Sequence, residues 1–338
     1  MDAPAPIRIG TSGWNYPSGR GAWTGVFYPS PRARARSAAR GSRSGGGAKL
    51  DELAFYADHF DTVEVNSSFY RVPSPETTRS WARRTPPGFE FSVKLFQRFT
   101  HPAMATASGT AAAKESGGSW IAARAAADVG QSDVDEFRRA LDPLASSGKL
   151  GALLAQFPPS FKCEPESLGY LDWLLTAFRG CQVAVELRHR SWSDQLAATL
   201  DLLNERGAAW VQIDEPKFRY SIRQNFLPNV TTFYYLRLHG RNAAAWWNHE
   251  ETEDRYNYLY SRRELEPFAE TATAARRLVR KLYLYMNNHF EAKAVANAVM
   301  LKQRLNEPIT GEYPESFLER FPELRDVVPA ARAVDTLF

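Results

Sequence analysis

The chain has 338 residues, of which 44% are hydrophobic and 24% charged, and its formal net charge is +4. This composition is typical of one large globular domain or two ordinary ones. No apolar run approaches the roughly 20 residues of a membrane span, and the N-terminus lacks a secretory pattern, so we expect a cytoplasmic protein without a membrane partner. The two cysteines, Cys163 and Cys181, form no CxxC pair, which argues against a disulfide framework or a zinc knuckle.

The excess of basic residues comes from one segment. Residues 31–48 contain five arginines and no acidic residue, and without them 37 basic residues stand against 38 acidic ones. A polyanion partner such as nucleic acid is therefore an alternative and not the leading hypothesis. The segment has too few apolar residues to pack, which predicts a solvated loop.

Eight short runs of β-branched or aromatic residues follow one another along the chain, and each predicts a strand. They begin at Ile7, Thr62, Phe89, Leu150, Gln182, Ala208, Phe233 and Lys281. Between them, segments with apolar residues at helical spacing predict helices. These segments are 50–60, 133–144, 193–204 and 291–305. Helix starts are indicated by Ser74 before Pro75 and by the capping box from Ser261 to Glu264.

Alternating strands and helices predict the fold class α/β, as a TIM-type (β/α)8 barrel in a single domain over 7–305. Residues 31–48 and about 103–130 are expected to be flexible, low-complexity insertions, and 306–338 a C-terminal extension. An open doubly wound sheet is the competing architecture. It is disfavoured because no predicted strand is followed by GxGxxG or a Walker loop.

The active site of such a barrel lies at the carboxyl ends of its strands, and strand alternation indicates which side chains point inward. Four inward residues are candidates for catalysis, namely Glu64, Glu186, Asp214 and His239. The candidates for substrate binding are Trp14, Tyr16, Asn66, Phe69, Tyr70, Lys94, Gln156, Arg188, Arg237, Asn287 and Asn288. Val63, Val65, Leu236 and Leu238 have the opposite parity, which suits packing against helices.

The chemistry of these residues favours a polar or anionic ligand. Arg188 and Arg237 carry planar donor forks suited to carboxylate or phosphate, and Lys94 adds a further positive charge. Glu64 and Glu186 would act as general acid and base if their pKa values differ, with His239 or Asp214 as the competing proton carrier. No cofactor is predicted.

Two alternatives assign these residues other roles. The same carboxylates and His239 would suit a divalent metal ion, although the nearby cations oppose one and no HxH or HExxH spacing occurs. The charges would otherwise form a structural network of ion pairs without chemistry.

Several segments in series also resemble the YecE-like family, known as domain of unknown function 72. They are "IGTSGWNYPSGRGAWTGVFYP", "LAFYADHFDTVEVNSSFYRVPSPETTRSWARRTPPGFEFSVK", "LLAQFPPSF", "VAVELRHRSW", "YLRLHGR" and "YMNNHFEAKAVANA". The resemblance runs from about Ile7 to Leu305 and implies a TIM-type barrel. The family has no established activity, so the resemblance implies no substrate. The insertions after Pro31 and Pro102 depart from the family pattern without interrupting a strand-end motif.

Three functional hypotheses follow. The first is a hydrolase or related acid–base enzyme acting on a polar, anionic small molecule at the barrel mouth. The second is a nucleic-acid-binding protein or metal-assisted phosphodiesterase, in which aromatic rings stack on bases. The third is a non-catalytic ligand-binding barrel. The nearly neutral body of the chain favours the first, and the sequence does not indicate an oligomeric state.

Overall fold

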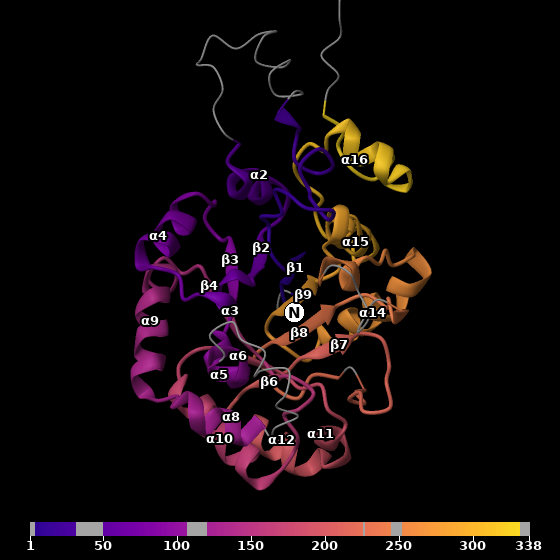
Figure 1. The fold of residues 1–338 in the computed structure, drawn as a ribbon. Helices are drawn as coiled ribbons and strands as arrows, with labels where there is room; N and C mark the ends of the chain where they lie inside the picture. The colour runs from indigo at the N-terminus through magenta and orange to yellow at the C-terminus, as the bar shows by residue number, and fades with distance from the viewer. Residues whose placement is uncertain (1–3, 32–49, 107–119, 226, 245–251, 332–338) are drawn as a thin grey trace, which may run out of the picture.

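Parallel strands form the centre of the molecule and helices surround them (Figure 1). The computed structural model describes residues 4–31, 50–106, 120–225, 227–244 and 252–331. The strands are β1 (Ile7–Thr11), β2 (Thr62–Val65), β3 (Glu90–Lys94), β4 (Leu150–Gln156), β5 (Val183–Glu186), β6 (Ala209–Trp210), β7 (Gln212–Asp214), β8 (Tyr234–Leu238) and β9 (Leu282–Met286). Their order is β1-β9-β8-β7 in one sheet and β2-β3-β4-β5-β6 in the other.

The two sheets are joined at both edges into one ring. At one edge Ser12, directly after β1, pairs in parallel with Glu64 of β2. At the other edge β6 pairs with β5 and β7 pairs with β8, and a single residue, Val211, separates β6 from β7. The predicted TIM-type α/β barrel is confirmed.

The strand predicted from Ala208 differs from expectation because it is divided between two neighbours. Side-chain amides take up backbone donors on either side of the break. Asn229 Oδ1 accepts from Trp210 N at 2.7 Å, and Gln224 Oε1 accepts from Ile213 N at 3.0 Å. These side-chain acceptors satisfy the two backbone donors in place of a neighbouring strand.

The predicted helices are present, together with several short ones. The α-helices are α2 (Glu52–His59), α3 (Ser67–Tyr70), α4 (Pro75–Arg83), α5 (Gln97–Thr100), α6 (Pro102–Thr106), α8 (Trp120–Ala127), α9 (Gln131–Ser146), α10 (Pro165–Ala177), α11 (Ser191–Asp194), α12 (Leu196–Glu205), α14 (Arg262–Ala275), α15 (Lys293–Arg304) and α16 (Glu315–Arg320). The 3-10 helices are η1 (Thr252–Tyr256), η2 (Phe290–Ala292) and η3 (Pro322–Leu324). Both helix starts indicated by the sequence are confirmed, since Ser74 caps α4 and Ser261 forms a capping box with Glu264.

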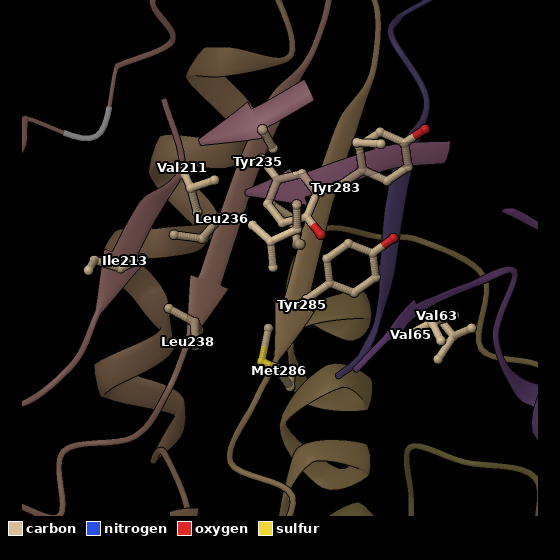
Figure 2. Close-up of a cluster of buried hydrophobic side chains, with 14 of the residues drawn as sticks. Val63, Val65, Val211, Ile213, Tyr235, Leu236, Leu238, Tyr283, Tyr285 and Met286 are labelled. Atoms are coloured by element: carbon tan, nitrogen blue, oxygen red, sulfur yellow. The ribbon is translucent and has the colours of Figure 1, made fainter. Parts of the chain in front are cut away.

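The outer face of the barrel is apolar. Val63, Val65, Leu236 and Leu238 are fully buried, and Figure 2 shows them among other buried side chains of the strands. Alternation along each strand separates this apolar face from the interior, as the sequence pattern predicts. Burial of these side chains holds the helices against the strands.

Tyr235, Tyr283 and Tyr285 lie together in the interior of the barrel, and Figure 2 shows their rings. The rings of Tyr235 and Tyr285 lie 5.3 Å apart between centroids, and those of Tyr283 and Tyr285 are stacked at 6.1 Å. Tyr283 donates to Glu90 at 2.5 Å, and Tyr235 donates to Glu64 at 2.7 Å. A buried hydroxyl or carboxylate is costly unless it is hydrogen-bonded, and these contacts satisfy that requirement.

The two predicted insertions have different outcomes. Residues 32–49, which hold most of the arginine-rich segment, lie outside the described residues. Both described ends of the segment 103–130 are helical, as α6 and α8. Trp120 of α8 is 5% exposed and packs its ring 4.5 Å from that of Phe161 and 4.8 Å from that of Tyr170. A large apolar anchor therefore holds α8 on the barrel.

The chain continues beyond the last barrel helix as a packed segment. Tyr313 and Phe317 are fully buried, and the Tyr313 ring meets His59 of α2 edge-on at 4.6 Å. Phe317 lies 6.1 Å from Phe27 between ring centroids. The described part of the predicted C-terminal extension thus covers one side of α2. Within the described residues, no helix is long and apolar enough to cross a membrane.

Truncation of the α8 anchor tests whether this segment belongs to the core. We expect Trp120→Ala to lower the free energy of unfolding by about 3–5 kcal/mol, because it removes a buried indole from an aromatic cluster. Urea unfolding of the variant and the parent protein measures the difference. Met104→Ala in α6 is the control, since Met104 is 47% exposed and its loss should change stability by about 0.5 kcal/mol or less. Equal effects of the two substitutions would contradict the packing of α8.

Candidate functional site

A pocket of about 540 Å³ opens at the carboxyl ends of the strands. It is lined by Gly13, Trp14, Asn15, Tyr16, Asn66, Ser67, Tyr70, Trp81, Lys94, Gln156, Arg237, Tyr256, Asn287 and His289. Lys94 and Arg237 supply a lysine and an arginine to this lining, which contains no Asp or Glu among the described residues. The pocket lies where barrels place their active sites.

Arg237 joins two carboxylates beneath the pocket. Its Nε and Nη2 donate to the two carboxylate oxygens of Glu64 at 2.9 and 2.7 Å, and its Nη1 donates to Glu186 at 2.5 Å. Arg237 is 1% exposed, and both glutamates are fully buried. This planar fork satisfies the charges that the sequence predicted on the interior face of the barrel.

A second guanidinium continues the alternation of charge. Arg188 donates to Glu186 at 2.7 Å and lies 3.4 Å from Glu215, measured from Nη1 to Oε2. Burial alone would raise the pKa of Glu186, but Arg237 and Arg188 outweigh it and hold this pKa well below its ordinary value. Glu186 is therefore a permanent carboxylate, which makes it unsuited to donate a proton.

His239 is a neutral part of the same network. Burial lowers its pKa to about 3, and Glu186 opposes this shift only in part. Its Nδ1 lies 2.7 Å from Asn287 Nδ2, and its Nε2 lies 3.4 Å from Glu186 Oε1. At neutral pH the imidazole is therefore uncharged. So low a pKa makes His239 a poor proton carrier.

Among the residues that the structure describes, Lys94 differs from the neighbouring cations because it has no carboxylate partner. Lys94 is the last residue of β3 and lines the pocket. Its Nζ lies 4.0 Å from the centroid of the Phe69 ring. None of the ion pairs among the described residues includes Lys94; the adjacent acids bind Arg237 and Arg188 instead. Burial and the charge of Arg237 lower the pKa of Lys94 to about 7, so a large fraction of its amine is uncharged near neutral pH.

Aromatic rings form one wall of the pocket. His289 stacks on Tyr16 with ring centroids 4.4 Å apart, and Tyr256 lies 4.8 Å from His289. Trp14 meets Trp81 edge-on at 5.5 Å. These rings present flat, partly polar surfaces to a bound molecule.

The loop after β9 holds His289 in place through an unusual backbone. Glu291 and Ala292 adopt φ angles of 49° and 61°, a left-handed conformation that is uncommon outside glycine. The backbone of this loop is fixed by Trp23, whose Nε1 donates to the His289 carbonyl at 2.7 Å. Strained residues of this kind persist where surrounding contacts determine the geometry, and they gather at functional sites.

The pocket brings together most of the binding residues predicted from the sequence. Those that line it are Trp14, Tyr16, Asn66, Tyr70, Lys94, Gln156, Arg237 and Asn287. Glu64, Glu186, Arg188 and His239 lie in the charged network beneath it. Phe69 is 4% exposed and supports Lys94, while Asn288 is fully buried and donates to Tyr258 O and Asn297 Oδ1, each at 2.7 Å.

The inward position predicted for Asp214 is wrong. In the strand register Arg237 stands beside Ile213, and Asp214 stands beside Leu238, which belongs to the outer face. Asp214 accepts hydrogen bonds from Arg241 at 2.8 Å and from Tyr260 at 2.7 Å. The alternation continues from β6 to β7, with Ala209 beside Ala184 and Ile213 beside Arg237, so the odd-numbered residues share the interior face and Asp214 does not.

Several residues of the site were not predicted. Glu215, one position after Asp214, joins the charged network, and burial raises its pKa above the ordinary value. Trp81 comes from helix α4, and His289 comes from the loop after β9. Strand parity gives no signal for residues in helices or loops. For His289 the sequence did offer a signal, because this residue directly follows Asn287 and Asn288 at the end of β9.

The carboxylates are not arranged as a ligand set for a metal ion. Among the described residues, no three His, Cys, Asp or Glu side chains are grouped so that they would hold one. Glu64 and Glu186 direct their oxygens at the guanidinium of Arg237. Within the described residues, the geometry therefore adds no support to the alternative of a divalent metal ion.

Removal of Arg237 tests the network directly. Arg237→Met should lower the free energy of unfolding at pH 7 by about 3–5 kcal/mol, because it leaves two carboxylates buried without their partner. The folded-state pKa of Glu186 lies below the unfolded value, so its contribution is present above the unfolded pKa and is lost as pH falls through the folded one. The difference between parent and variant should therefore narrow on acidification, as measured by urea unfolding.

A matched control is Arg304→Met, which breaks the exposed ion pair with Glu266 on the surface. That variant should be close to the parent in stability, since exposed pairs contribute little. A loss in Arg237→Met no larger than in Arg304→Met would show that the buried network is not a structural requirement of the barrel mouth.

Comparison with known proteins agrees with the resemblance in the sequence. The model of the family described as "Protein of unknown function DUF72" matches residues 8–317. The UPF0759 protein YunF of Bacillus subtilis (strain 168) is 27% identical over 278 residues, which are 79% of this chain and 91% of that protein. The UPF0759 protein YecE of Escherichia coli (strain K12) is 29% identical over 141 residues, 41% of this chain and 42% of that protein.

Solved structures give the same result. A DUF72 family protein of Thermotoga maritima MSB8 is 30% identical, with a TM-score of 0.68, covering 89% of this chain and 100% of that one. A DUF72 family protein of Enterococcus faecalis V583, 23% identical, shares the fold with a TM-score of 0.67 over 89% of this chain and 96% of its own. The family model alone spans most of the sequence, and the chain therefore belongs to the DUF72 family of proteins of unknown function.

Proposed function

We propose that the protein is an acid–base enzyme, with hydrolysis as its candidate reaction, acting on a polar, anionic small molecule in the mouth pocket. The observation that carries this proposal is Lys94, an amine without an acidic partner in a pocket whose described lining contains no Asp or Glu. Strongly perturbed side chains in a cleft are characteristic of functional sites.

The remaining lining supports a polar ligand with a negative charge. The side-chain amides of Asn15, Asn66, Gln156 and Asn287 line the pocket. Amides bind hydroxyl and carboxylate groups alike. A ligand anion would supply the negative charge that the pocket lining lacks.

The geometry changes the roles proposed for the acidic residues. Glu64 and Glu186 were expected to transfer protons, but both accept hydrogen bonds from Arg237. We assign them the role of holding Arg237 at the floor of the pocket. Proton transfer falls to Lys94, because a group with a pKa near the working pH is the most effective general base or acid.

A ligand screen by thermal shift tests this proposal. Sugar acids, phosphorylated sugars and 2-oxo acids should raise the melting temperature at pH 7, while their neutral counterparts should not, since binding to the folded state stabilises it. Lys94→Met should reduce the apparent affinity for the anions at least tenfold. Lys162→Met is the matched control at an exposed lysine and should bind as the parent does.

Compounds that stabilise the parent protein then become substrates for turnover assays, in which Lys94→Met should lose activity. Stabilisation by oligonucleotides alone, with a steep dependence on salt, would contradict the proposal and favour a nucleic-acid partner. Tight binding of an anion without any product would instead identify a non-catalytic ligand-binding barrel.

A further inference from the structure

We propose that the ε-amine of Lys94 forms a Schiff base with the carbonyl group of its substrate, and that this substrate is a 2-oxo acid. The inference rests on the proposed function and specifies its substrate class. It starts from three observations on the described residues. Lys94 is accessible from the pocket, it lacks an acidic partner, and the acids around it are bound to other cations.

Position is the first requirement for a nucleophilic amine. Lys94 is the last residue of β3, at the barrel end that carries the pocket, and its side chain is partly exposed there. Ser68 donates to the Lys94 carbonyl at 2.6 Å and fixes the backbone at this point. The Phe69 ring supports the Nζ group from one side at 4.0 Å, so the amine can be approached from the open side.

Charge pairing is the second requirement. The Arg237 guanidinium binds Glu64 through two nitrogens and Glu186 through the third, and Arg188 binds Glu186 and Glu215. These acids would otherwise hold Lys94 as an ammonium ion, which is not a nucleophile. With these acids bound to guanidinium groups, the Lys94 amine lacks an acidic partner among the described residues, and its uncharged fraction is the form that attacks carbonyl carbon.

The reaction needs no further reagent. The nitrogen lone pair forms a bond to the carbonyl carbon, and one amine proton moves to the oxygen, giving a carbinolamine. A proton taken up from water then protonates the hydroxyl, which leaves as water and gives the protonated imine. Atoms and charge balance as amine plus carbonyl compound plus one proton to protonated imine plus one water, without oxidation or reduction.

The charge of the product indicates the substrate class. A protonated imine is a cation whose positive charge, like that of the ammonium, finds no free carboxylate in the described site. A carboxylate next to the carbonyl carbon of the substrate supplies that counter-charge directly. This arrangement is the defining feature of a 2-oxo acid, and the lining amides are available to bind its carboxylate oxygens.

Reductive trapping tests the inference. The parent protein is incubated at pH 7 with sodium cyanoborohydride and pyruvate, phenylpyruvate or hydroxyacetone, the last being the uncharged analogue of pyruvate. Peptide mass mapping then locates the secondary amine that forms when the imine is reduced. We expect Lys94 to be modified at least tenfold faster than the exposed Lys162 by the 2-oxo acids, and much more slowly by hydroxyacetone.

Two variants make the result specific. Lys94→Arg should form no adduct at this position, and Lys162→Arg should label at Lys94 as the parent does. Modification of Lys94 no faster than Lys162, in a protein whose melting temperature rises with the same 2-oxo acids, would overturn the Schiff base and leave the proposed function standing. The absence of both the adduct and any stabilisation by anions would overturn both.

Discussion

The mouth of this barrel depends on the contact between Arg237 and the carboxylates of Glu64 and Glu186. Three charges from three strands are fully or almost fully buried, and each would be prohibitive alone. Together they satisfy one another through a planar donor fork and two acceptors. Tyr235 completes the arrangement by donating to Glu64 from below. The polar interior of the barrel is therefore stable because its hydrogen bonds are complete.

The same contact determines the chemistry above it. Among the described residues, each acid that faces the interior near the mouth is paired with a guanidinium. No acid is therefore left to pair with Lys94. A lysine in that position loses its charge more easily than a solvated lysine does. The structural network and the proposed reacting group are thus two results of one distribution of charges. The hypothesis of a structural ion-pair network and the hypothesis of an enzyme are therefore compatible, because they apply to different residues.

The sequence was sufficient for the fold and for much of the site. Alternating strand and helix signals predicted the barrel, and strand parity placed Glu64, Glu186 and Arg237 on the interior face, where they lie. The prediction failed at Asp214 because the wrong set of alternate residues was assigned to the interior: Ala209 stands beside Ala184 and Ile213 beside Arg237, so the odd-numbered residues face inward. The polar residues Gln212 and Asp214 share the other parity, so the polar pattern of this segment indicated the wrong face.

Other features depend on contacts that a sequence does not display. Trp81 and His289 reach the pocket from a helix and a loop, where the period of two has no meaning. The role of Lys94 was the least accessible, since it follows from which acid pairs with which cation. The three acids and three cations that the sequence predicted on the interior face are consistent with several pairings. Only the geometry shows that two arginines bind the acids and that the lysine does not share them.

The measurement that tests this account most directly is an NMR titration of Lys94. The protein is labelled with ¹³C at the lysine ε-carbon, and Lys94→Arg assigns the resonance by its disappearance. The account predicts a titration midpoint at about pH 7 for Lys94. A midpoint near the ordinary lysine value of about 10.4 would show that Lys94 is a charged ammonium at neutral pH and would contradict the account.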